Sequence, residues 1–147
     1  MLALLFVFIA MQFIRPALNT NTADQPGEFI QQFNVPANVT GILKTSCYDC
    51  HSNNTRYPWY ANVQPFGWLL ANHIKEGKRE LNFSEFGSYP KRRQTSKLKA
   101  IAGSVKDGSM PLSSYTLIHG DAKLDDSEKQ LLIDWFSKAK DSLDAKQ

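Results

Sequence analysis

Apolar positions recur at helical intervals in several segments of this chain. In residues 39–50 they are three or four apart, which places them on one face of a helix. Residues 66–75, which follow Pro65, repeat the pattern, and Gly77 is expected to weaken that helix. A shorter candidate covers residues 96–103 and ends at a glycine. Each of these segments predicts an amphipathic helix.

The clearest helical pattern lies near the C-terminus. Asp125 and Glu128 have the spacing of a capping box, in which each end residue binds the backbone N–H of the other. An apolar stripe follows, formed by Leu131, Leu132, Trp135, Phe136 and Leu143. A helix over about residues 126–143 is therefore expected. Strand-like runs are brief, such as residues 115–118, and repeats are absent, so the pattern predicts a small all-α domain.

The first residues are apolar on every side. Residues 2–14 contain one polar side chain, Gln12, and Arg15 follows them. This run is shorter than the roughly 20 residues of a membrane-spanning helix, and it lacks the basic start of a secretory signal. Since a charge follows it and no small-residue cleavage site does, we interpret residues 1–15 as a signal or uncleaved membrane anchor. The polar residues 16–37 are interpreted as a linker, and residues 38–147 as one domain.

Both cysteines of the chain lie in one pentad, Cys47-Tyr48-Asp49-Cys50-His51. Two thiols three residues apart on a helical turn lie on one face, and the adjoining imidazole can reach a metal at the same place. This C-x-x-C-H spacing is typical of c-type haem attachment. The pentad therefore predicts one covalently bound haem c, with Cys47 and Cys50 as attachment points and His51 as an iron ligand.

Other uses of a cysteine pair fit less well. A redox C-x-x-C is expected after a β-strand, and no strand pattern precedes Cys47. A structural zinc site needs four ligands, whereas the other histidines, His73 and His119, are isolated from each other. A disulfide between residues so close in sequence would constrain the unfolded chain little. These three alternatives rank below haem.

The second axial ligand decides whether a haem protein carries electrons or binds small molecules. Met110 is the one thioether beyond the N-terminal segment, and it lies in the loop Gly108-Ser109-Met110-Pro111. We predict His51 and Met110 as the metal ligands. His73, on the apolar face of its helix, is the rival and would give bis-histidine ligation. His119 is the weaker rival, and an open or water-bound site is a further alternative.

Arg56 follows the pentad closely. Its guanidinium could bind a haem propionate with two hydrogen bonds, although a solvated surface arginine is an equally good interpretation.

From residue 39 to residue 136 the chain resembles the bacterial haem-binding domain family of small, anchored, cytochrome-c-like proteins. The resemblance runs through residues 47–60, 67–86 and 109–136. It implies covalent haem at Cys47 and Cys50, ligation by His51, and a helical cytochrome-like fold with a Met-Pro loop before the last helix. Met110 matches the distal methionine of cytochromes c. The segment around His73 is typical of the family but not of ordinary cytochromes c, so a role for His73 stays open.

We expect a mono-haem electron-transfer protein with no catalytic residue. The alternatives are a haem-based sensor and a peroxidase-like enzyme. Residues 73–100 hold eight Lys or Arg against three Glu, whereas five Lys face seven acids from residue 121 onward. This asymmetry predicts a basic patch that suits an acidic redox partner or anionic lipid, although a merely solvated face fits equally well. We expect a bacterial inner-membrane anchor with a periplasmic haem domain, and no nucleic-acid binding.

Overall fold

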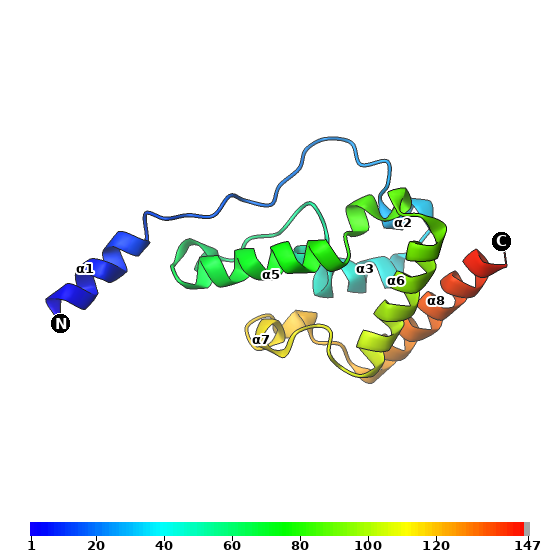
Figure 1. Ribbon diagram of the computed structural model, residues 1–147. Coiled ribbons are helices and arrows are strands. Elements are labelled where there is room, and N and C mark those ends of the chain that lie inside the picture. The colour runs from blue at the N-terminus through cyan, green and yellow to red at the C-terminus, as the bar shows by residue number, and fades with distance from the viewer. Residues whose placement is uncertain (146–147) are drawn as a thin grey trace.

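The computed structural model describes residues 1–145 and shows helices throughout, with no strand among those residues. The predicted all-α class is confirmed. The last two residues of the predicted domain, 146–147, lie outside the described residues. The elements are α1 (Leu2–Met11), α2 (Phe29–Gln32), α3 (Ala37–Ser46), α4 (Tyr48–His51), η1 (Trp59–Asn62), α5 (Phe66–Glu80), η2 (Phe83–Ser88), α6 (Lys91–Lys106), α7 (Ser113–Thr116), η3 (Gly120–Ala122) and α8 (Asp126–Asp144) (Figure 1).

Helix α8 agrees with its prediction to within one residue. The Asp125 carboxylate accepts a hydrogen bond from the Glu128 backbone N–H at 2.8 Å, and the Glu128 carboxylate accepts one from the Asp125 N–H at 3.0 Å. Both interactions satisfy N–H groups that a helix start leaves without partners. Leu132 and Phe136 are fully buried where α8 packs along α6, so the stripe faces the core as expected.

Helix α6 is twice as long as the predicted segment 96–103. It begins directly after Pro90, and the Arg93 guanidinium lies 4.0 Å from the centre of the Tyr89 ring, which covers the first turn. Leu98 and Val105 are buried against α8, so packing extends the helix through its glycine at position 103. The prediction was too short because contacts with α8 stabilise turns whose own sequence is largely polar.

The brief run at 115–118 is not a strand, because α7 covers residues 113–116. Helix α5 differs from its prediction too, since it continues through Gly77 to Glu80. A Cβ atom at Gly77 would lie 2.7 Å from the Cys50 carbonyl oxygen. The glycine therefore serves a close approach between α5 and α4, and it does not mark the end of the helix.

Gly77→Ala is expected to lower the free energy of unfolding by about 1–3 kcal/mol, because the added methyl group overlaps the backbone of α4. Gly103→Ala is the matched control, since a Cβ there meets nothing within 4 Å and alanine favours helix by about 0.5–1 kcal/mol. Urea unfolding of both variants measures the difference. Equal stability of the two proteins would show that α5 does not approach α4 this closely.

The core lies between α8, α6, α3 and η2, and an aromatic cluster fills it. Its centre is Phe29, which is fully buried and lies 4.8 Å from Phe33, 4.9 Å from Phe86 and 5.9 Å from Phe136 between ring centroids. Phe29 belongs to the segment 16–37 that we predicted as a linker. The last part of that segment therefore packs as part of the domain, because α2 buries apolar side chains that a free linker would expose.

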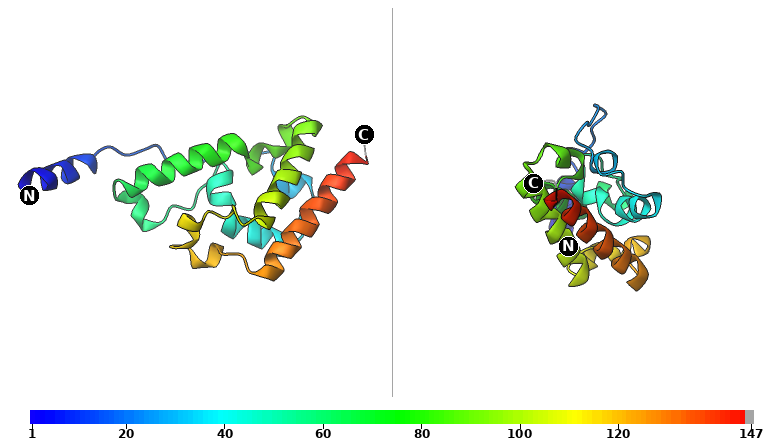
Figure 2. Two further views of the ribbon diagram at one scale, coloured as in Figure 1. Left: turned by 60° about the horizontal axis from the view of Figure 1, so that its bottom comes forward. Right: turned by 90° about the vertical axis from the view of Figure 1, so that its right-hand side faces the viewer.

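Helix α1 stands apart from this core. Its side chains lie outside the core, and it projects beyond the start of α5 at the end opposite to the C-terminus (Figures 1 and 2). Across residues 1–145, none of the helices combines the length and apolar character needed to cross a membrane.

Candidate functional site

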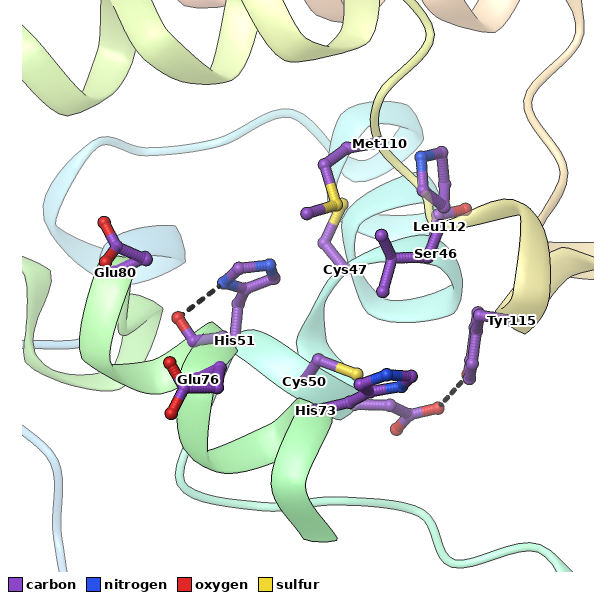
Figure 3. A pocket seen from close by; sticks show the side chains of 13 residues that line it. Ser46, Cys47, Cys50, His51, His73, Glu76, Glu80, Met110, Leu112 and Tyr115 are labelled. Carbon is purple, nitrogen blue, oxygen red and sulfur yellow. Dashed lines mark hydrogen bonds between the residues drawn. The ribbon is translucent and has the colours of Figure 1, made fainter. Parts of the chain in front are cut away.

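One cleft collects the side chains that the sequence singled out. It is bounded by the end of α3, by α4, by α5 and α6, and by the loop that joins α6 to α7 (Figure 3). Two adjoining cavities form it and share Cys47, His51 and Met110, and the first of them has a volume of about 190 Å³. Cys50 also lines the first cavity. The structure therefore brings all four predicted site residues together.

The pentad reaches the cleft through a break between two helices. Helix α3 ends at Ser46, Cys47 has a non-helical backbone with φ −129°, and the single turn α4 then carries Cys50 and His51. The Cys47 carbonyl accepts hydrogen bonds from the N–H groups of Cys50 at 3.2 Å and His51 at 3.0 Å, so this turn is held closed. Both thiols are free.

The two thiols are poor nucleophiles for redox chemistry. Burial raises the pKa of Cys47 to about 12 and that of Cys50 to about 11, helped by the neighbouring thiol and the Asp49 carboxylate respectively. A redox-active C-x-x-C motif depends on a lowered thiol pKa. These thiols stay protonated at neutral pH, which favours an attachment role over a redox role.

His51 is fixed by helix α5. Its Nδ1 lies 3.0 Å from the Gly77 carbonyl oxygen and 3.1 Å from the Leu81 carbonyl oxygen. Because both partners are acceptors, Nδ1 carries the proton and donates, which leaves Nε2 with a free lone pair. Burial also lowers the pKa of His51 and so favours the neutral ring. A neutral imidazole oriented through its other nitrogen is the arrangement that a metal ligand requires.

Met110 lies in the loop between α6 and α7. Its backbone N–H donates to the Ser104 carbonyl at 3.1 Å, and Gly108 takes a positive φ of 74° where the chain turns away from α6. The Met110 side chain lines both cavities of the cleft and is 36% exposed (Figure 3). The loop thus presents a thioether to the cleft that holds His51.

The two remaining histidines differ in their position relative to the cleft. His73, on α5, lines the first cavity together with Met110. His119 lies outside the lining of both cavities: its Nε2 is 2.8 Å from the Tyr60 hydroxyl, and its ring stacks on Tyr115 with centroids 4.2 Å apart. The geometry therefore keeps His73 as a possible ligand and gives His119 a hydrogen-bonding role.

Asp49 is a site residue that sequence reasoning missed. It is 7% exposed, and its carboxylate accepts hydrogen bonds from the Tyr115 hydroxyl at 2.8 Å and from the Arg56 guanidinium at 3.3 Å. Arg56, considered above as a propionate ligand or a solvated surface residue, pairs with this carboxylate, which raises the Arg56 pKa. The bond to Tyr115 ties the pentad to α7, directly after the Met110 loop (Figure 3).

Tyr115→Phe is expected to loosen α7, since it removes the hydroxyl that donates to buried Asp49. Loss of such a bond costs about 1–3 kcal/mol, and amide hydrogen exchange in residues 115–119 should quicken accordingly. Tyr57→Phe is the control, because the Tyr57 hydroxyl bonds the Asn19 backbone N–H, outside the cleft. Unchanged exchange in Tyr115→Phe, measured by mass spectrometry, would show that the tie does not hold the loop.

Charged side chains border the cleft mouth. Glu80 of α5 and Lys97 of α6 form an ion pair of 3.6 Å across it, and Glu76 pairs with Arg79 on α5. Such exposed pairs contribute little to stability. They do place charge beside an otherwise apolar cavity.

An all-helical domain with two free thiols and an oriented imidazole in one apolar cleft defines a protein built to hold a bulky prosthetic group. The chain belongs to the haem-binding domain family, whose sequence model matches residues 6–138. The family resemblance predicted from the sequence is confirmed. No curated protein and no solved structure matches the chain.

Haem fits the residues of the cleft. A flat, largely apolar macrocycle needs apolar walls and a ligand for iron. The walls are supplied by Leu81, Phe83, Ala100, Ile101, Val105 and Leu112, which line one or other cavity. The His51 imidazole, with its Nε2 lone pair free, would supply the ligand. The protein is therefore a haem-binding protein.

Proposed function

We propose that this protein is a mono-haem electron-transfer protein of the c type, with a cytochrome-c-like helical domain. The observation that carries the proposal is the double hydrogen bond from His51 Nδ1 to two carbonyls of the α5 end, beside both thiols. This arrangement orients an iron ligand at the place where two sulfur atoms can attach a porphyrin. It is the local geometry that the C-x-x-C-H spacing requires.

The two thiols would attach the porphyrin. Each S–H would add across one vinyl group, so that the sulfur bonds one carbon, the hydrogen goes to the other, and the C=C bond becomes a single bond. Cys47 and Cys50 would form the two thioethers. The addition would consume no oxidant or reductant.

Electron transfer would follow from two residues that hold the iron throughout. Haem would supply a one-electron couple at its iron. On the protein side, the His51 imidazole and the Met110 thioether would hold the iron, and the tie between Tyr115 and Asp49 would keep the methionine loop in place. Because neither residue has to leave for the iron to change its charge, such a site carries electrons without transforming a substrate.

A second candidate is supported by His73. It lines the same cavity as Met110, so it could replace the thioether as a sixth ligand or act beside an iron from which Met110 is displaced. The protein would then be a haem-based sensor, or a peroxidase-like enzyme with His73 as its acid–base group. Exposure of Met110 at 36% is the observation that favours a displaceable ligand.

We also propose attachment to the bacterial inner membrane through residues 1–15, with the haem domain in the periplasm. Supporting features are the uniformly apolar α1 and the need of c-type maturation for an exported chain. The redox partner would be an acidic protein. Exposed basic residues of α6, among them Arg92, Arg93 and Lys99, would form the docking surface, whereas Lys97 at the cleft is paired with Glu80.

Cysteine variants test the covalent attachment. The protein is exported in cells that carry the c-type maturation machinery, denatured, and extracted with acidic acetone. We expect haem to stay with the wild-type polypeptide, as an intact mass increased by one haem. Cys47→Ala and Cys50→Ala should each leave at most one thioether, and the double variant should lose all covalent haem. Full extraction of haem from wild type would contradict the proposal.

A further inference from the structure

Two segments at one end of the domain contain no charged residue, and Arg15, which bonds the Gln12 carbonyl, lies beside them. Residues 57–74 contain no Asp, Glu, Lys or Arg, and neither do residues 108–120, although 21% of the chain is charged. The first run forms η1 and most of α5, and the second forms the methionine loop and α7. They meet in space, since the Tyr60 hydroxyl lies 2.8 Å from His119 Nε2. Two segments far apart in sequence thus build one uncharged surface.

Large apolar side chains are exposed on this surface, which we call the uncharged end. From the first run, Trp59 is 79% exposed and Phe66 is 54% exposed. From the second run, Leu117 is 86% exposed and Ile118 is 59% exposed. Single exposed apolar residues are ordinary, but a group of this kind without charges marks a contact surface.

Helix α1 is fixed to the same end. The Gln12 side chain pairs with the backbone of Gln64, accepting from its N–H at 2.8 Å and donating to its carbonyl at 3.2 Å. The Trp68 indole N–H donates to the Ile14 carbonyl at 2.7 Å. These three bonds hold the base of α1 against the start of α5, so α1 leaves the domain at the uncharged end (Figure 2).

The charged elements lie elsewhere. The end of helix α8 and the start of α6, which carries the cluster Lys91-Arg92-Arg93, lie toward the other end of the molecule in Figure 1 and in the left view of Figure 2. Helix α1 itself carries no charged residue and exposes its apolar side chains all round. The polarity of the molecule therefore changes along its long direction, from α1 to the C-terminus.

We propose that the uncharged end rests on a lipid bilayer, with α1 inserted and with Trp59, Phe66, Leu117 and Ile118 at the boundary between headgroups and acyl chains. This inference rests on the proposed membrane attachment and adds to it a fixed orientation of the domain. Tryptophan is enriched at this depth of a bilayer, and a surface without charged side chains avoids the large cost of removing charge from water. The basic start of α6 then faces away from the bilayer, toward soluble partners.

Hydrogen exchange of the full-length holoprotein tests the orientation. Exchange is measured with the protein alone and with phosphatidylcholine vesicles, whose lack of net charge removes any contribution from basic residues. We expect vesicles to slow exchange of backbone amides in residues 59–70 and 115–119, and to leave α8 unchanged. Flotation of the vesicles in the same samples measures the fraction of protein bound to lipid, which gives the partition coefficient.

A charge-insertion variant makes the test specific. Trp59→Asp combined with Leu117→Asp places two carboxylates on exposed positions of the uncharged end, and it is expected to lower the partition coefficient at least tenfold. Ser142→Asp, on the exposed side of α8, is the control and should change it less than twofold. The haem spectrum of each variant shows whether the site is intact.

The outcomes separate the two proposals. If the protein floats with vesicles but residues 59–70 and 115–119 exchange as before, α1 inserts alone and the orientation is wrong, while the attachment stands. If wild type does not float, both attachment and orientation are wrong. If protection depends on protein concentration and not on lipid, the surface binds a second copy, which also overturns the proposal. Loss of covalent haem would count against the proposed function alone.

Discussion

Met110→Ala is expected to abolish the weak sulfur-to-iron absorption band of the oxidised protein. The band requires a thioether on the iron, and Met110 is the thioether that lines the cleft. The midpoint potential should also fall, on the order of 0.1 V or more, because methionine ligation raises the potential of haem iron. Covalent haem should stay in place, since both cysteines are untouched. Absorption spectroscopy and a redox titration of the purified variant measure these effects.

The control for Met110→Ala is His73→Ala, which alters the rival ligand in the same cavity. If Met110 is the ligand, His73→Ala should keep the sulfur-to-iron band and shift the potential much less. A changed spin state in His73→Ala, with an unchanged spectrum in Met110→Ala, would assign the sixth position to His73. The protein would then belong to the bis-histidine alternative.

Phe29→Ala is expected to destabilise the protein by about 3–5 kcal/mol. Phe29 is fully buried and packs against four rings from three parts of the chain, so truncation leaves a cavity that rigid aromatic neighbours cannot fill. A loss of that size is a large part of the unfolding free energy of a small domain. Denaturant unfolding followed by circular dichroism provides the measurement.

Phe13→Ala is the matched control, because Phe13 is 83% exposed at the end of the N-terminal segment. Its unfolding free energy should stay within about 0.5 kcal/mol of wild type. If Phe29→Ala were equally mild, residues 16–37 would be a linker after all, and the domain would begin at α3.

Features encoded locally were the ones that the sequence predicted well. The capping box of α8 and the C-x-x-C-H pentad each lie within five consecutive residues, so spacing alone identifies them. The apolar stripe of α8 repeats at the helical period and indicates which side is buried. Family membership followed from the same local motifs.

Features that depend on distant contacts were missed. The length of α6 comes from packing on α8, and the burial of Phe29 comes from rings up to 107 residues away. Gly77 was expected to weaken its helix, because the room that it leaves for the Cys50 carbonyl is visible only in three dimensions. Asp49 bonds Tyr115 across 66 residues of sequence, and no spacing rule connects them. The position of Asp49 inside the pentad was the one signal in the sequence that could have pointed to it.

The central claim is a covalently held haem with His51 and Met110 on its iron. The most direct test is an absorption spectrum of the oxidised full-length protein after export with the maturation machinery, repeated on the denatured polypeptide. The account predicts a sulfur-to-iron band in the folded protein, and a haem spectrum that stays with the polypeptide after acidic acetone extraction. Haem that extracts completely, or an oxidised spectrum without the sulfur-to-iron band, would contradict it.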